Sequence, residues 1–360
     1  MERDDFMKTQ FAFCAAGAAL LASCASVDPN AEYAHVSAIA ETESVSSTGD
    51  AADDPAVWVN TANPEASLVL GTDKQAGLYV YDLAGDVVQF LPTGAVNNVD
   101  LRQDVIFGSA AGIDLAAASN RTINGVTLYE ISEAGEVTES TSFPVPTTEP
   151  YGLCVGYDEN GYRVFVTYKT GQIEIFTVNA QSGGGYTATL DNTLQLSSQL
   201  EGCSYDEVQN TLFVGEEEAG LWRIDLNGAE EFARRMVDSV NSGSGLVADV
   251  EGIDIWRGPV NTGYLVASAQ AGDRYVIYER AAPNRWVGTF SIISSFDGTF
   301  DAVTHTDGIT VSSAPLGEAF PEGILVVQDD SDGENGTSQN FKFVSWSDVI
   351  ASIEARSTPE

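Results

Sequence analysis

A repeat of about 50 residues constrains the fold more than any other feature of this sequence. Six similar openings each lead into an apolar run, and they are marked by Asp54, Asp100, Tyr151, Glu201, Glu251 and Asp307. Successive markers are 46, 51, 50, 50 and 56 residues apart. About 20 residues after each opening comes a strand, a polar turn and a second strand, which is the pattern of a β-hairpin.

Six all-β units of this length predict an all-β fold, a six-bladed β-propeller. The innermost strands of a propeller surround one channel, so equivalent positions on them converge at one end of it. A β-sandwich or a β-solenoid is the alternative. However, a sandwich does not predict so even a repeat, and solenoid repeats are usually shorter. Two short helices are also expected, over Phe232–Ser239 and Trp346–Ala355.

The N-terminus has the pattern of a secretory signal. From Met7 the chain reads "MKTQFAFCAAGAALLASC", in which Lys8 is followed by an apolar core of 11 residues. That core is too short to cross a bilayer, which takes about 20 residues. The segment "LASC" resembles a bacterial lipobox and predicts a lipid on Cys24, whereas an ordinary signal peptide cleaved nearby is the alternative.

These patterns divide the chain into four parts. We expect a signal peptide over residues 1–24, with Met7 as an alternative start, and a linker over 25–44. The propeller should cover 45–352 and a tail 353–360. The protein should therefore be exported, as an outer-membrane lipoprotein or in a periplasmic or secreted form.

Charge and rare residues exclude several classes of partner. The chain has 16 basic and 53 acidic residues, a net charge of −37. Such a surface repels nucleic acid and anionic membranes, so we expect membrane contact only through a lipid anchor. His35 and His305 are the only histidines, which argues against a zinc site built from several of them.

Two cysteines lie in the expected propeller, Cys154 and Cys203, 49 residues apart. They follow equivalent markers of adjacent repeats, so the fold should bring them to neighbouring blades. Export permits a disulfide between them. Two small buried thiols are the alternative.

The openings carry acids that should meet at one end of the channel, namely Asp53, Asp54, Asp100, Glu201, Asp249, Glu251 and Asp307. The hairpins add basic residues in the first three repeats (Lys74, Arg121, Lys169) and acidic residues in the fourth and sixth. Carboxylates this crowded stay ionised only if a cation neutralises them. Oxygen ligands without histidine suit Ca²⁺ best, ahead of Mg²⁺ or Mn²⁺.

An anion that bridges calcium and touches three basic side chains is most simply a phosphate ester. The cysteines are not followed by the arginine-closed loop of a cysteine phosphatase, and neither histidine lies in an Arg-His-Gly context. Attack by metal-activated water therefore remains. The alternative is that the acids hold one structural calcium and the basic residues only pair with them.

The motifs resemble a known family when they are read in order. They are "DDPAVW", "NNVDLR", "AAASNR", "PYG", "LEG", "GEEEAGLW", "DVEGIDI", "IYER", "TDGI", "VVQD" and "QNFKFVSW", spread over about residues 45–350. In this order they resemble the β-propeller phytases, the alkaline calcium-dependent 3-phytases of bacteria. The resemblance implies a six-bladed propeller that uses several Ca²⁺ ions to hydrolyse phytate, inositol hexakisphosphate. We expect a monomer.

The resemblance also implies a role for particular residues. The ligands of the catalytic calcium ions would be Asp53, Glu201, Glu217, Asp249 and Glu251, with Tyr151 contacting this cluster. Substrate phosphates would be bound by Lys74, Arg121 and Lys169. Other calcium sites would involve Asp54, Asp100, Asp307, Asp329 and Asn340.

Two positions depart from the pattern of that family. Gln75 stands where a second lysine is common, which would weaken binding of an adjacent phosphate. His305 stands where an acid is common, which puts one calcium site near the channel in doubt. A calcium-dependent lactonase or phosphotriesterase is the alternative enzyme. A non-catalytic binding propeller is the alternative of another class.

Overall fold

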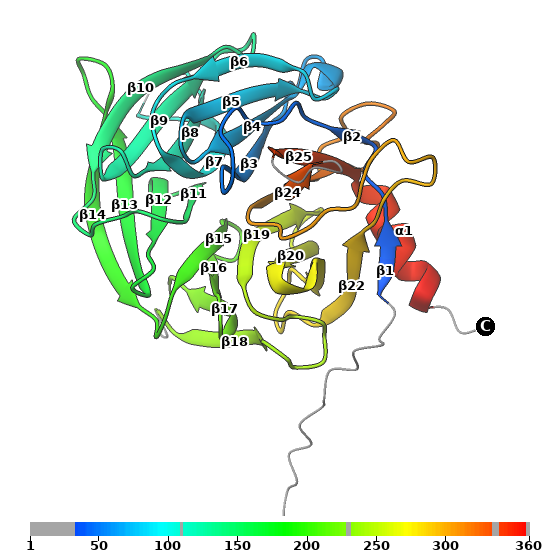
Figure 1. Cartoon of the computed structure of the whole chain (residues 1–360). Coiled ribbons are helices and arrows are strands. Elements are labelled where there is room, and N and C mark those ends of the chain that lie inside the picture. Colours follow the sequence, from blue (N-terminus) through cyan, green and yellow to red (C-terminus); the bar gives the residue numbers. More distant parts are fainter. Residues whose placement is uncertain (1–32, 109–110, 228–231, 333–337, 358–360) are drawn as a thin grey trace, which may run out of the picture.

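Six small sheets form a ring in which each sheet follows the previous one along the chain (Figure 1). The computed structural model describes residues 33–108, 111–227, 232–332 and 338–357. Each sheet corresponds to one sequence repeat, with the marked opening at the start of its innermost strand. The six-bladed propeller expected from the repeat is therefore confirmed.

The first three blades are simple four-stranded antiparallel meanders. Blade 1 contains β3 (Ala52–Trp58), β4 (Leu68–Asp73), β5 (Gly77–Asp82) and β6 (Val87–Leu91). Blade 2 contains β7 (Val96–Val105), β8 (Ile113–Asn120), β9 (Gly125–Ile131) and β10 (Val137–Pro144). Blade 3 contains β11 (Leu153–Asp158), β12 (Gly161–Thr167), β13 (Gln172–Ala180) and β14 (Tyr186–Gln195).

Blade 4 is a four-stranded meander of the same kind, whereas blades 5 and 6 each include an N-terminal strand. Blade 4 contains β15 (Leu200–Asp206), β16 (Thr211–Glu216), β17 (Gly220–Asp225) and β18 (Arg234–Ser239). Blade 5 contains β19 (Val250–Arg257), β20 (Gly263–Ala269), β21 (Arg274–Glu279), β22 (Trp286–Ile292) and β1 (Ala34–Val36). Blade 6 contains β23 (Ile309–Ser312), β24 (Ile324–Asp332), β25 (Ser338–Ser345) and β2 (Ala40–Glu41).

The N-terminal strands tie the two ends of the chain together. β2 is the outermost strand of blade 6, where Glu41 lies opposite Lys342, and β1 runs parallel to β22. The linker expected over 25–44 therefore contains two strands of the propeller. The expected signal peptide and Cys24 lie outside the described residues.

One of the two expected helices is wrong. α1 (Trp346–Ser357) begins where the sequence predicts and continues past 352, the expected end of the propeller. By contrast, Phe232–Ser239 contains β18, which pairs with β17. β18 is an edge strand that begins with two exposed arginines, a charged edge of the kind common in sheets, and pairing with its neighbour determines its conformation. Two 3₁₀ turns complete the elements, Pro64–Ala66 and Gln270–Gly272. No helix among the described residues has the length and apolar character needed to cross a membrane.

Apolar residues fill the spaces between neighbouring blades. One such cluster joins Leu115 and Val126 of blade 2 to Val164 and Phe176 of blade 3. A disulfide also joins the innermost strands of blades 3 and 4 through Cys154 and Cys203, whose Cα atoms are 5.6 Å apart. The blades are thus fixed relative to one another, as precise placement of side chains at the axis requires.

Glycines let the innermost strands approach each other closely. A methyl group at Gly202 would lie 2.1 Å from the carbonyl oxygen of Glu251, and one at Gly152 would lie 1.9 Å from that of Glu201. Gly252 and Gly308 make the equivalent contacts further round the ring, and their N–H groups donate to the carbonyls of the next blade. A side chain at these positions would push adjacent blades apart, which explains the glycine that follows the marker in four of the six openings.

Candidate functional site

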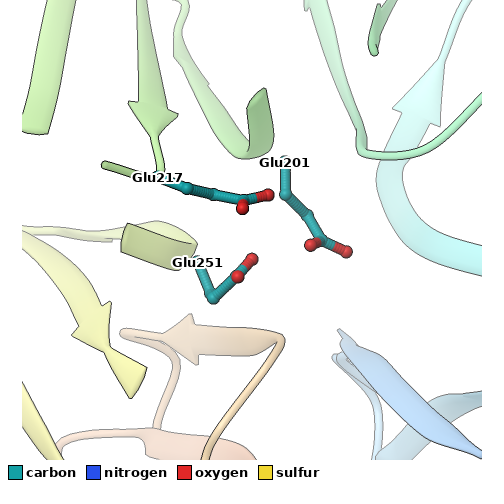
Figure 2. A group of neighbouring side chains, drawn as sticks. All are labelled: Glu201, Glu217 and Glu251. Carbon is teal, nitrogen blue, oxygen red and sulfur yellow. The ribbon is translucent and has the colours of Figure 1, made fainter. Parts of the chain in front are cut away.

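Three glutamates from two adjacent blades converge at the end of the ring where the innermost strands begin (Figure 2). Glu201 and Glu251 are the second residues of β15 and β19, and Glu217 follows β16. One carboxylate oxygen of each lies within 4.8 Å of the others. All three side chains are at least nine-tenths buried.

Bulges in the innermost strands β15 and β19 aim the side chains of Glu201 and Glu251. Glu201 and Gly202 together face a single residue of β16, and Glu251 and Gly252 do the same against β20. β3 and β7 have the same irregularity, at residues 53–54 and 97–98. Because a bulge leaves the ladder and re-aims its side chains, the same local distortion supplies a polar group from each of four blades.

Crowding and burial work against ionisation of the cluster. Burial, together with the charges of Glu201 and Asp249, raises the pKa of Glu217 to about 7. Burial and the neighbouring Glu201 raise the pKa of Glu251 well above its usual range. Burial also raises the pKa of Glu201, although hydrogen bonds from its neighbours, including the Tyr151 hydroxyl, oppose the shift. The positive charge around the three glutamates is therefore too small to offset burial and the repulsion between their carboxylates.

Some of its oxygens have no donor. Oε1 of Glu217 and Oε2 of Glu251 are buried and accept no hydrogen bond from any residue that the structure describes. Desolvated carboxylate oxygens of this kind are costly unless they are paired. An all-oxygen, anionic and crowded set of ligands fits a hard cation such as Ca²⁺.

A second acidic pair lies beside the cluster and surrounds a lysine. The ammonium group of Lys74, in the turn after β4, is 3.0 Å from Asp53 and 2.8 Å from Asp307. Burial raises the pKa of both carboxyl groups to about 7, although the charge of Lys74 opposes it. The pKa of Lys74 is raised above its usual value, because these carboxylates outweigh the effect of burial.

Two further basic side chains lie on this side of the mouth, the end of the ring where the innermost strands begin. Arg121 Nη2 donates to the carbonyl of Lys74 at 3.2 Å, and its charge lowers the pKa of Asp53. Lys169 is exposed, with its ammonium group 4.2 Å from the centroid of the Tyr151 ring. The structure thus brings basic side chains from blades 1, 2 and 3 close to acids from blades 4 and 5.

Not every residue expected at the mouth is part of the glutamate cluster. Asp249 is half-buried in the loop before β19 and its charge acts on Glu217, so it lies at the mouth. Asp54 accepts the Val99 N–H at 3.0 Å and lines a cavity of only about 20 Å³. Its pKa is raised well above the usual range by burial and by Asp53.

Asp100 does not lie at the start of its innermost strand, where a marker is expected, but is the fifth residue of β7. Its carboxylate is 2.9 Å from Arg102 and accepts the Val155 N–H, in a cavity of about 430 Å³ that Glu207 and Arg257 also line. The bulge of β7 instead places Asn97 and Asn98 where the other blades have their markers.

Asn97 is the residue that the sequence reasoning missed. Its Nδ2 donates to Oε1 of Glu201 at 3.0 Å, and its own Oδ1 is buried without a donor among the described residues. The signal was present, because "NNV" occupies the same place in its repeat as "DDP" does in the first.

The remaining candidates lie apart from the cluster. Asp329 and Asn340 face each other on β24 and β25, where the ammonium group of Lys342 is 3.4 Å from Asp329 and 2.8 Å from Glu41. Oδ1 of Asn340 is buried and accepts no hydrogen bond within the described chain. A calcium ion at this position stays a prediction. His305 is exposed and contacts Asp273.

Three comparisons relate the chain to known proteins. A family model described as Phytase matches residues 8–357. The 3-phytase of Bacillus subtilis (strain 168) is 37% identical over 362 aligned residues, which cover 95% of this chain and 92% of that protein. A chain of the crystal structure of the mitotic checkpoint complex aligns over 96% of this chain and 87% of its own length. Its TM-score is 0.49 and its identity 13%, so this likeness carries no weight.

The raised pKa values predict how pH affects the stability of the calcium-free protein. The carboxyl groups of Asp53, Glu217 and Asp307 have a pKa of about 7 in the folded state, against about 4 in the unfolded state. Between these values the unfolded chain has lost protons that the folded protein keeps, so stability falls as pH rises. In EGTA, Tm should drop by several degrees from about pH 5 to about pH 8.

Scanning calorimetry at both pH values measures this effect, and added calcium should restore the lost stability at the higher pH. Glu217→Gln is the matched control, because an amide cannot ionise and the drop should become smaller. A Tm in EGTA that stays constant or rises over this range would contradict the account.

Proposed function

The chain belongs to the phytase family and is a 3-phytase, an enzyme that hydrolyses phytate, and from this premise we propose that it depends on calcium and leaves lower inositol phosphates as products. One observation carries the proposal. Three buried glutamates, two of which have an unpaired oxygen, lie next to three basic side chains at one end of the propeller. Such a site combines a cation-binding half with a phosphate-binding half.

In this proposal Glu201, Glu217 and Glu251 hold the cation, together with Asp53 and Asp249. Calcium bound there supplies the positive charge that lowers the pKa of water and offsets the charge of the phosphate. Asn97 and Tyr151 keep the Glu201 carboxylate turned toward the mouth through their hydrogen bonds. The other calcium ions would be held by Asp54, Asp100, Asp307, Asp329 and Asn340, as the resemblance implies.

The basic residues act on the substrate. Lys74, Arg121 and Lys169 come from three different blades, so they can contact a phosphate group from several directions and offset its charge. Water supplies the new oxygen, the bond from phosphorus to the inositol oxygen breaks, and that oxygen takes up a proton. Lys169 also lies over the Tyr151 ring, which fixes the position of an otherwise mobile side chain.

We further propose that the protein is monomeric, exported and anchored through a lipid on Cys24. The signal pattern of residues 1–24 supports export and the anchor. The disulfide between Cys154 and Cys203 also supports export, because disulfides are typical of oxidising compartments.

Fractionation of bacteria that express the full chain tests the anchor. The wild-type protein should partition with membranes, and Cys24→Ser should move it to the soluble fraction, because the substitution removes the residue that would carry the lipid anchor. An equal distribution of both forms would show that Cys24 carries no anchor.

The calcium requirement is tested by phosphate release from phytate, measured with residues 25–360 in Ca²⁺ and in EGTA. We expect activity in calcium, loss of activity in EGTA, and a decrease of at least about 100-fold in Glu251→Gln, because that change removes a charged ligand from the cluster. The matched control is Glu159→Gln, an exposed acid in the turn between β11 and β12. Activity that persists in EGTA would contradict calcium dependence.

A further inference from the structure

A short exposed segment lies over the turn that carries Lys74. This segment, Ser46–Asp50, is called the strap. Gln75, next to Lys74, donates from Nε2 to the carbonyl oxygens of Thr48 at 3.2 Å and Asp50 at 2.9 Å. The side chain of Gln75 therefore binds the strap.

Other hydrogen bonds fix the strap to the same turn. The Ser47 N–H donates to Oδ2 of Asp73 at 3.2 Å, and the Lys74 N–H donates to the carbonyl of Ala51 at 2.7 Å. Gly49 adopts a φ of +75°, in the left-handed region that glycine favours, and a side chain there would meet no other atom. The strap is thus bound along one edge and open to solvent on the other.

The strap brings the carboxylate of Asp50 into contact with the ammonium group of Lys74. Oδ1 of Asp50 is 2.5 Å from the Lys74 ammonium group. The other two carboxylates around that group, from Asp53 and Asp307, are 1% and 16% exposed, whereas Asp50 is 80% exposed. Asp50 is therefore the partner of Lys74 that solvent and solutes reach first.

We propose that Asp50 is a stand-in for substrate phosphate, a carboxylate that occupies the open side of Lys74 and must be displaced when a phosphate group binds. The inference rests on the proposed function, in which Lys74 binds phosphate. An ammonium group already in contact with three carboxylates attracts a further anion weakly, and a phosphate beside Asp50 is also repelled by its charge.

The chemistry of the strap suits an exchange of anions. Asp53 and Asp307 are held in place by burial, whereas the Asp50 carboxylate can move into water at little cost, because exposed ion pairs contribute little. When phosphate leaves, the carboxylate returns to Lys74 and reduces rebinding of the product. Asp50 should therefore weaken the affinity of the enzyme for free phosphate as well as for phytate.

Phosphate binding tests this inference directly. Inorganic phosphate is titrated into calcium-loaded protein by calorimetry, and KM for phytate is measured in parallel. Asp50→Asn should bind phosphate about two- to fivefold more tightly and lower KM by a similar factor, the range expected when an exposed ion pair is removed. Gln75→Ala should change both values in the same direction by less, because it releases the strap and keeps the carboxylate.

Two further variants separate the possible outcomes. Glu159→Gln removes the same charge from the turn at the far end of β11 and should leave both values unchanged. If Lys74→Met does not weaken phosphate binding, the proposed role of Lys74 is wrong. If Lys74→Met weakens binding but Asp50→Asn has no effect or weakens it, this inference alone is overturned. A higher calcium requirement in Asp50→Asn would also overturn it, because Asp50 would then be a calcium ligand.

Discussion

The close approach of neighbouring innermost strands is the constraint on which the rest of the structure depends. Gly152, Gly202, Gly252 and Gly308 allow it, because a larger residue would clash with the next strand. That contact sets the width of the ring at the mouth. It also brings bulged residues of neighbouring blades within a few ångströms of each other. The crowding of carboxylates is thus a consequence of how the blades meet.

Charge is distributed unevenly around the mouth. Basic side chains come from blades 1 to 3, and the acidic cluster comes from blades 4 and 5. Lys74 neutralises Asp53 and Asp307, but the described residues provide no comparable partner for the unpaired oxygens of Glu217 and Glu251. The protein alone therefore satisfies half of its site, and in the proposed function a cation followed by a phosphate would complete the other half.

The sequence predicts the parts of this structure that repeat. A period near 50 residues determines the number of blades and places equivalent residues at one end of the ring, so the sequence predicts which acidic and basic side chains should meet there. The errors concern features that depend on strand pairing. β1 and β2 are strands because partners distant in sequence pair with them, and β18 is a strand because it pairs with β17, the strand before it. In the second repeat the charge of Asp100 is conspicuous in the sequence, whereas the register of β7 places Asn97 at the bulge.

The central claim is that a cation replaces protons at the crowded carboxylates. Calorimetric titration of calcium into the stripped protein, repeated at about pH 6 in two buffers of different ionisation enthalpy, counts the protons released. The account predicts release of at least about one proton per protein at this pH and much less at about pH 9, where the groups with a pKa of about 7 are already ionised. Calcium binding without proton release at the lower pH, or no binding at all, would contradict it.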